Sequence, residues 1–380
     1  MSMVILVLNC DRSTGTGFIR ALRRAQGGGW GTDVTILGTA AHPLRTALSD
    51  ADRTFLIDSN RPDRVVAEIS RRTGRDIDLV YETRSAEAML RLSRARHRVP
   101  TFLAPHKILA VFEDKYRTFL HLSAHGLPVP RTFLISRPGD VHRAFTRLSG
   151  RSAWVRQTHG QGGRGAFASD SPAEVVAALE RHCGWNRYTI SERLPTDRAH
   201  PWADRLSSRL LPGEMITWGA LYAHGKLIAG QTRKRLYWEH ADLTRSGVTG
   251  YTGAAMTLTR PDVHALSEKI VRSFDWAPHG PLGIDYLVDE ASELKVTEIQ
   301  ASRFFTSTYP LALSGLNLPR LFVDAARGVT DTVDSVDPCP EGLLYVQRFG
   351  SPGRIVHRDD VLAAIEAGQF SMRSEDDSHV

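Results

Sequence analysis

Two acidic residues and a glutamine near the end of the chain are spaced to meet on one face of a β-hairpin. Asp285 lies in the apolar run LGIDYLV, and Glu298 lies in KVTEIQA. If the chain turns near residue 291, the two carboxylates come out opposite each other, and Gln300 projects from the same face as Glu298. Facing carboxylates repel unless a cation lies between them, and hard oxygen donors suit Mg²⁺ bound to phosphates. We therefore expect a metal site at Asp285, Glu298 and Gln300. A solvated strand face is the alternative, and the apolar neighbours on both sides argue against it.

A glycine-rich stretch, WVRQTHGQGGRGAF at residues 154–167, places four glycines in six positions. Glycine costs about 0.5–1 kcal/mol relative to alanine wherever the chain is ordered. Such a loop is either a flexible turn or a place where backbone lies close against a ligand, because amides without a Cβ can approach phosphate oxygens. Lys115, at an expected helix start, and Arg156, at a strand end, supply cations. Together with the metal site, they predict a phosphorylated ligand.

Composition limits the class of protein. A chain of 380 residues should divide into two or three domains. No apolar run approaches 18 residues, so no transmembrane helix is expected, and the N-terminus has the pattern of a buried strand rather than a signal peptide. Cys10, Cys183 and Cys339 lie far apart with no CxxC pair, which argues against a disulfide framework or a zinc site and for a reducing cytoplasm.

The net charge of +6 does not by itself indicate nucleic acid. Basic residues are interleaved with acidic ones, as in RRTGRDID, and no run of five or more basic residues occurs. We therefore expect an anionic small-molecule ligand and neither a nucleic-acid nor a membrane partner.

Residues 1–105 alternate between apolar runs and helical spacing, which predicts a parallel sheet with helices on its faces. The expected strands are 3–9, 33–38, 54–58 and 77–82, and the expected helices lie near 18–25, 61–73 and 85–96. The turn STGTG contains Gly15 and Gly17 but not the full G-x-G-x-x-G fingerprint, and no acidic residue ends the second strand. We interpret it as a structural turn.

The rest of the chain has a mixed α+β pattern. A helix with Glu113 and Asp114 in its first turn is expected to end at Gly126. It is followed by strand 131–135, helix 138–148, strand 153–158, the glycine loop, strand 165–170, helix 172–182 and strand 188–194. Residues 215–237 predict two long antiparallel strands joined at His224–Gly225. A loop at 243–255, a helix at 261–274, the hairpin 282–289/294–300 and a final helix at 317–327 follow. One more hairpin within 342–356 and a disordered tail at 371–380 complete the prediction.

The order of these pieces resembles the ATP-grasp superfamily. The matching segments, DKYRTFLHLSAHGLPVP, VRQTHGQGGRGA, ISERLP and GIDYLVDEASELKVTEIQASRF, span residues 106–305. The segments LPGEMITWGALYAHGKLIAGQTRKRL and LTRSGVTGYTGAA look closest to stand-alone ligases similar to carbamoyl-phosphate synthase. The resemblance implies two α+β lobes that clasp ATP, preceded by a Rossmann-like parallel-sheet domain. The implied domains are residues 1–105, residues 106–328 with a lid lobe at about 138–195, and a C-terminal extension at 329–380.

The resemblance also assigns roles to single residues. Lys115 and Arg156 match the family's lid cations, and Gly160, Gly162, Gly163 and Gly165 match its mobile phosphate-covering loop, so we expect 158–166 to be mobile without nucleotide. Glu192, Arg193 and Leu194 match the adenine hinge, Glu214 the ribose-binding acid, and Asp285 and Glu298 the metal ligands. Gln300 stands where the family usually has Asn. Arg303 matches the arginine that follows this motif only with a shift of one residue, because Ser302 occupies the nominal position.

Further basic and aromatic residues are candidates for holding substrate. Arg233, Lys234 and Arg235, with Arg303, could hold the substrate carboxylate or an acyl phosphate, and alternation lets Arg233 and Arg235 share a strand face. A solvated strand edge is the alternative. Trp218, Tyr237 and Trp238 either line an aromatic acceptor pocket or pack in the core.

The activity implied by the resemblance is ATP-dependent ligation. A carboxylate attacks the γ-phosphoryl group of ATP, and the acyl phosphate then meets an amine to give an amide, ADP and phosphate. ATP and Mg²⁺ are the implied cofactors, with Mn²⁺ as an alternative. Positioning and electrostatics carry the rate, so His159, Ser302 and Cys183 are not read as nucleophiles. Release of a phosphorylated product, as in a kinase or a carbamoyl-phosphate-type enzyme, and a regulatory ATP-binding protein without turnover are the alternatives. A homodimer through the N-terminal domain is the expected assembly.

Overall fold

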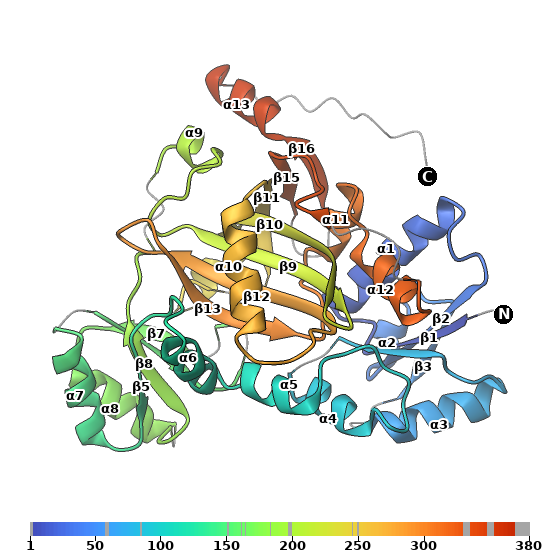
Figure 1. The fold of residues 1–380 in the computed structure, drawn as a ribbon, viewed down its shortest axis with the longest axis horizontal. Coiled ribbons are helices and arrows are strands. Elements are labelled where there is room, and N and C mark those ends of the chain that lie inside the picture. The colour runs from blue at the N-terminus through green and yellow to red at the C-terminus, as the bar shows by residue number, and fades with distance from the viewer. Residues whose placement is uncertain are drawn as a thin grey trace.

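A computed structural model of the chain (Figure 1) describes residues 3–57, 61–83, 86–149, 152–160, 162–163, 165–182, 184–196, 200–244, 246–248, 251–329, 335–347 and 353–368. Within these residues the strands form three sheets. A parallel sheet is built from the N-terminal residues, a large mixed sheet forms the centre, and a small antiparallel sheet forms the lid. Cys183 and the tail at 371–380 lie outside the described residues, so the expectations for them are not tested.

The N-terminal sheet is parallel, as the sequence predicted. Its strands, in the spatial order β3-β2-β1-β4, are β1 (Met3–Leu8), β2 (Val34–Ala40), β3 (Arg53–Leu56) and β4 (Leu79–Glu82). Helices α1 (Ser13–Gly27), α2 (Pro43–Thr46) and α3 (Pro62–Thr73) connect them, and α4 (Ala86–Ala95) follows β4. Every residue of β1 is buried, as is typical of a parallel strand covered on both faces.

The central sheet holds the two long strands predicted around His224–Gly225. Strands β9 (Met215–Ala223) and β10 (Lys226–Trp238) are antiparallel, and both turn residues have positive φ, as a tight hairpin turn requires. The predicted hairpin of β12 (Gly280–Val288) and β13 (Leu294–Ala301) adjoins β9, and the C-terminal hairpin of β15 (Leu343–Val346) and β16 (Arg354–His357) extends the other side. The short β14 (Ser335–Val336) pairs with β10.

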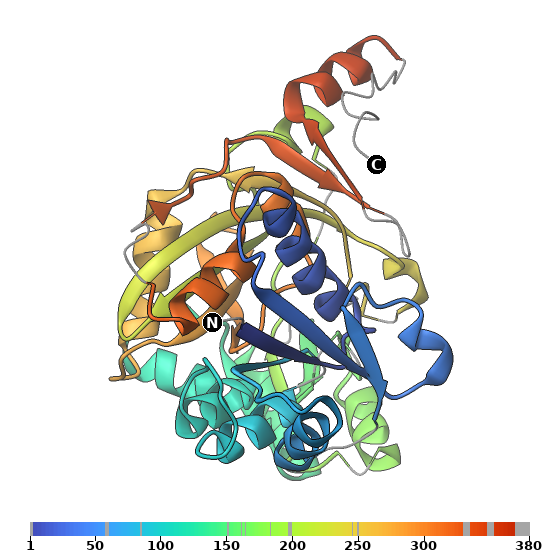
Figure 2. The same cartoon turned by 90° about the vertical axis from the view of Figure 1, so that its right-hand side faces the viewer.

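Two expectations for this sheet and its surroundings are wrong. The loop expected at 243–255 gives way to strand β11 (Thr252–Leu258), whose seven residues are all buried between β10 and β15. Its sequence, TGAAMTL, has small residues and no polar alternation, so it lacks the usual strand signal. The helix at 317–327, found as α12 (Leu318–Ala326), is not the last, because α13 (Arg358–Glu366) follows. Figure 1, and the turned view in Figure 2, show α13 lying beyond β16, the edge strand of the central sheet.

The lid sheet has the order β5-β8-β6-β7, formed by β5 (Thr132–Ile135), β6 (Ala153–Gln157), β7 (Phe167–Ser169) and β8 (Tyr188–Glu192). Helices α7 (Pro138–Arg147) and α8 (Pro172–Arg181) pack on it around a separate hydrophobic core. Because β5 belongs to this sheet, its strands begin before residue 138, the start expected for the lid lobe.

The remaining helices before the C-terminal hairpin lie between or beside the sheets. They are α5 (His106–Phe112), α6 (Lys115–Ala124), α9 (Trp202–Arg205), η1 (Ala241–Leu243), α10 (Pro261–Arg272) and α11 (Thr308–Leu313). Helix α10 covers one face of the central sheet, while α12 packs with Leu221 of β9 on the opposite face and joins it to α1 (Figure 1). Asp114 caps α6 by accepting hydrogen bonds from the Tyr116 and Arg117 amides, and Glu113 belongs to the end of α5 rather than to the first turn of α6.

No helix in the described part of the chain has the length and apolar character needed to span a bilayer. Cys10 and Cys339 are both buried and carry free thiols.

Candidate functional site

A cavity of about 830 Å³ lies where the three sheets meet, which is the size expected of a ligand-binding cleft. The described residues that line it come from all three parts: Arg12, Ser13, Thr14 and Thr83 from the N-terminal domain, Trp154, Arg156 and Ser191 from the lid sheet, and Met215, Arg235, Asp285 and Glu298 from the central sheet. Most of the predicted site residues therefore come together in one place.

Asp285 and Glu298 are direct partners across β12 and β13, as the hairpin argument predicted. Asp285 Oδ1 accepts a hydrogen bond of 2.6 Å from the Thr217 hydroxyl and lies 3.6 Å from Arg235 Nη2. Glu298 Oε1 lies 3.7 Å from Lys115 Nζ. Gln300, two residues along the same strand, also lines the cavity. The expected constellation of two carboxylates and an amide is thus formed.

These donors fit a magnesium ion that is completed by other ligands. Among the described residues, no group of three or more His, Cys, Asp or Glu side chains is placed to hold a metal by itself. Asp285, Glu298 and Gln300 supply carboxylate and amide oxygens, which Mg²⁺ accepts together with phosphate oxygens and water. The site therefore suits a metal that arrives with a nucleotide better than a permanently bound ion.

Lys115 and Arg156 place two cations beside the glycine loop. Lys115 Nζ donates a hydrogen bond of 2.6 Å to the carbonyl oxygen of Gly160. The Arg156 guanidinium lies 5.0 Å from the Phe119 ring centre, and its Nε has no hydrogen-bond partner among the described residues. Burial lowers the pKa of Arg156 to about 10, and the charge of Glu298 opposes this effect, so Arg156 stays protonated at neutral pH. The Arg156 N–H groups that lack an acceptor favour binding of an anion in the cavity.

The glycine loop lies against the segment 246–248, which precedes β11. Gly160, Gly162 and Gly163 line the cavity, and a Cβ at Gly163 would lie only 2.7 Å from the Val248 carbonyl oxygen. Gly165 is not among the described lining residues, because it packs against the Tyr188 hydroxyl. Residues 161 and 164 lie outside the described residues, so the expected mobility of 158–166 remains a prediction.

The residues of the expected adenine hinge all line the cavity: Glu192 ends β8, and Arg193 and Leu194 follow it. The Glu192 carboxylate accepts a hydrogen bond of 2.9 Å from Arg131 Nε. The Arg193 amide donates to the Ser152 carbonyl, which ties the hinge to the lid sheet.

Glu214 does not lie where a ribose-binding acid was expected. Its carboxylate is buried in an ion pair of 2.8 Å with Lys234 Nζ, and it accepts a hydrogen bond from the Leu211 amide. Side chains alternate along β9, so Met215 faces the cavity and Glu214 faces the opposite side of the sheet. Lys234 also faces that side, and its remaining donors bond the carbonyls of Ser207 and Arg209. Neither residue reaches the cavity, so the assignments of Glu214 to the ribose and of Lys234 to the substrate are corrected.

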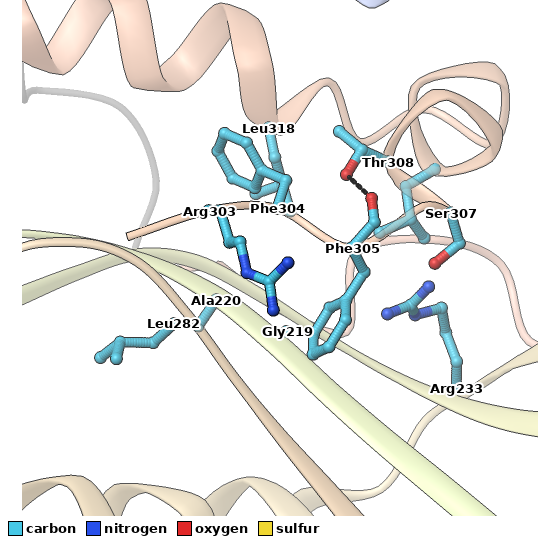
Figure 3. Close-up of a pocket in the computed structure, with 11 residues that line it drawn as sticks. Gly219, Ala220, Arg233, Leu282, Arg303, Phe304, Phe305, Ser307, Thr308 and Leu318 are labelled. Carbon is cyan, nitrogen blue, oxygen red and sulfur yellow. Dashed lines mark hydrogen bonds between the residues drawn. The ribbon is translucent and has the colours of Figure 1, made fainter. Parts of the chain in front are cut away.

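The three arginines proposed to hold substrate occupy different positions. Arg235 lines the cavity, where its Nε donates to the Thr252 hydroxyl and its guanidinium lies 3.8 Å from the Trp238 ring centre. Arg303 also lines the cavity. Arg233 shares the strand face of Arg235 but lines a smaller neighbouring pocket instead (Figure 3).

The residues on either side of Arg303 are anchored. Ser302 has a φ of +66°, and its hydroxyl accepts a hydrogen bond from the Ala104 amide. The Phe304 amide donates to the Tyr81 hydroxyl, and the Phe304 ring packs among aromatic residues of both domains. These anchors leave Arg303 to reach into the cavity.

Sequence reasoning missed some residues of the cavity and misplaced others. Arg12, Ser13 and Thr14 follow β1 and line the cavity. The STGTG stretch, interpreted as a structural turn, instead forms the start of helix α1. Its position at the carboxyl end of a parallel strand, where such sheets bind ligands, is the signal that would have found these residues. No sequence pattern indicated that Phe305 would line the cavity. Of the three aromatic candidates, Trp238 lines the cavity, whereas Trp218 is fully buried in the core and Tyr237 packs against it.

No protein-family model matches the sequence, and no curated protein matches it with significance. Solved structures do resemble it. One is the biotin carboxylase domain of 2-oxoglutarate carboxylase from Hydrogenobacter thermophilus with MgADP, ADP and bicarbonate, with a TM-score of 0.65 and 12% identity over 90% of this chain and 73% of that one. Another is N5-carboxyaminoimidazole synthetase from Staphylococcus aureus, with a TM-score of 0.64 and 12% identity over 91% of this chain and 82% of that one.

A third similar structure is carboxyaminoimidazole ribonucleotide synthase from Aspergillus clavatus in complex with ATP. Its TM-score is 0.63, and its identity is 14% over 91% of this chain and 81% of that one. At these identities the likeness establishes the fold and not the reaction. This chain therefore has the ATP-grasp fold, preceded by a parallel-sheet domain, as the order of its sequence motifs predicted.

Proposed function

We propose that this protein is an ATP-dependent ligase that activates a carboxylate as an acyl phosphate and couples it to an amine. The observation that carries the proposal is the Asp285–Glu298 pair, which faces a large cavity ringed by cations. The similar structures support it, since their names describe carboxylating ligases and several contain ADP or ATP.

Each part of the cavity has a role in this proposal. Asp285, Glu298 and Gln300 would hold Mg²⁺, which neutralises negative charge on the transferring phosphoryl group. The backbone of residues 192–194 would receive the adenine, and the loop amides at 160–163 would cover the phosphates. Lys115 and Arg156 would balance the phosphate charge, and Arg235 and Arg303 would orient the substrate carboxylate.

The reaction needs two substitutions and no side-chain nucleophile. A carboxylate oxygen bonds to the γ-phosphorus as the bond to the β–γ bridging oxygen breaks, which releases ADP. The amine then bonds to the acyl carbon, inorganic phosphate leaves, and the amine loses a proton. The protein contributes positioning and charge stabilisation in both steps.

The test is an ADP-release screen of carboxylic acids, first with hydroxylamine as the acceptor and then with amino acids and amines. The proposal predicts ADP release that depends on one class of carboxylate, with a hydroxamate formed in equal amount. AMP and pyrophosphate as products would contradict the acyl-phosphate mechanism. A stable phosphorylated product formed without amine would favour the kinase-like or carbamoyl-phosphate-type alternative. Nucleotide binding without turnover across the panel would favour a regulatory role.

A further inference from the structure

A second, much smaller pocket adjoins the large cavity. Its lining includes Gly219, Arg233, Arg303, Phe305 and Ser307, and its volume is about 10 Å³, room for roughly one water molecule (Figure 3). Arg303 and Phe305 also line the large cavity, so the two spaces share a wall.

Arg233 is a buried cation with no polar partner among the residues that the structure describes. Its exposed fraction is 6%, and its guanidinium makes no hydrogen bond or ion pair with any described residue, its Nε included. Its recorded close contact is with the Phe305 ring, whose centre lies 5.4 Å from the guanidinium carbon. Burial, reinforced by the neighbouring charge of Arg235, lowers the pKa of Arg233 to about 10, so Arg233 remains charged at neutral pH. A buried, charged group with unfilled donors is costly unless an anion joins it.

Phe305 closes the small pocket off from the large one. In Figure 3 its ring stands between the side chains of Arg303 and Arg233. The ring lies on Gly219 and Gly283, which pair directly across β9 and β12. A Cβ at Gly283 would come within 2.1 Å of the ring, so only glycine leaves room for the ring at this position.

We propose that Phe305 is a gate over an anion subsite formed by Arg233 and Arg303, and that a carboxylate group of the substrate enters it when the ring swings away. The closed pocket is too small for a carboxylate, so binding requires the ring to move. A planar guanidinium with free N–H groups suits a carboxylate, which can accept two of them at once. The identity of the ligand rests on the proposed function, but the existence of the subsite does not.

The first test needs no turnover. Crystals of the wild type, of Phe305→Ala and of the double variant Phe305→Ala/Arg233→Met are soaked in sodium bromide, and anomalous density locates the anions. We expect bromide between Arg233 and Arg303 in Phe305→Ala and none there in the double variant. Gly283→Ala, which displaces the ring without removing it, should admit bromide as well. No bromide beside Arg233 in either opened variant, or equal density in the double variant, would overturn the proposal.

The second test uses the carboxylate identified by ADP release. Arg233→Met should raise KM for the carboxylate by about tenfold or more, because a charged hydrogen-bonding partner is lost, with little change in KM for ATP. Arg53→Met is the matched control, because Arg53 lies 4.8 Å from the Phe55 ring centre far from the cavity. Carboxylate-dependent ADP release with an unchanged KM in Arg233→Met would leave the ligase proposal standing and overturn the subsite. Bromide at Arg233 without carboxylate-dependent turnover would support the subsite and remove the ligase proposal.

Discussion

Asp285 and Glu298 face each other across neighbouring strands, and each has a different cation beside it. Arg235 Nη2 lies 3.6 Å from Asp285, and Lys115 Nζ lies 3.7 Å from Glu298. These cations offset the repulsion between the two carboxylates. Lys115 also donates a hydrogen bond to Gly160, so one side chain joins Glu298, the glycine loop and α6.

Gly163→Ala should weaken ATP binding. The new Cβ would lie 2.7 Å from the Val248 carbonyl oxygen, at a backbone φ of +66° that non-glycine residues disfavour. We expect Kd for ATP to rise by about tenfold, measured by isothermal titration calorimetry. Gly74→Ala is the control, because Gly74 has the same φ with open space around it and ends α3 away from the cavity. An unchanged Kd would show that the contact with Val248 does not hold the loop closed.

Breaking the buried Glu214–Lys234 pair should affect stability rather than nucleotide binding. Lys234 is fully buried, and burial lowers its pKa while Glu214 holds it charged. Removing one partner of such a pair costs about 3–5 kcal/mol. Glu214→Gln should therefore lower the free energy of unfolding in urea, and Glu214→Leu/Lys234→Met should recover part of the loss. A loss of ATP affinity with unchanged stability would restore Glu214 to the ribose role.

His279 should make the protein less stable in acid. Burial, with help from the charges of His224 and Arg96, lowers its pKa to about 4, and its Nδ1 accepts a hydrogen bond from the His224 amide. The unfolded chain takes up a proton near pH 6.5, whereas the folded protein resists it until about pH 4. Stability contributed by this group is therefore lost as pH falls between these values, by up to about 1.4 kcal/mol per pH unit.

The measurement is urea unfolding of wild type and His279→Asn from pH 7 to pH 4.5. The variant keeps an acceptor without a titrating ring, so its stability should fall less steeply over this range. His142→Asn, at an exposed position of α7, is the control and should follow the wild type. If the free energy of unfolding falls equally steeply with pH in wild type and in His279→Asn, His279 is not the cause of the loss of stability.

Local sequence pattern predicted much of the fold and the pairing of Asp285 with Glu298. Alternation in KVTEIQA and LGIDYLV was enough to pair Asp285 with Glu298, because a hairpin fixes register within a few residues. Local sequence pattern did not predict β11, because its small, buried residues show no alternation of polar and apolar side chains. The same alternation correctly placed Arg233 and Arg235 on one strand face, but it could not predict that the two side chains line different pockets. That difference comes from Phe305, which lies far along the chain and covers two glycines of other strands.

Glu214 shows that the order of motifs in a family does not determine which side of the sheet each side chain faces. The motif order placed an acid near the ribose, but strand alternation set by Met215 turns Glu214 to the opposite face. Arg12, Ser13 and Thr14 were missed for a different reason, because their place at the carboxyl end of a parallel strand was not used as a signal. Contacts of α1 with α11 and α12 bring this strand end to the cavity.

The central claim is that Asp285 and Glu298 bind the metal of a nucleotide complex, and titration of ADP at increasing Mg²⁺ tests it most directly. Wild type should bind ADP more tightly as Mg²⁺ rises, and Glu298→Gln should lose most of this dependence. Asp289→Asn, in the turn of the same hairpin but outside the described cavity lining, should behave as wild type. If Glu298→Gln keeps the full Mg²⁺ dependence, or if wild type shows none, the account is contradicted.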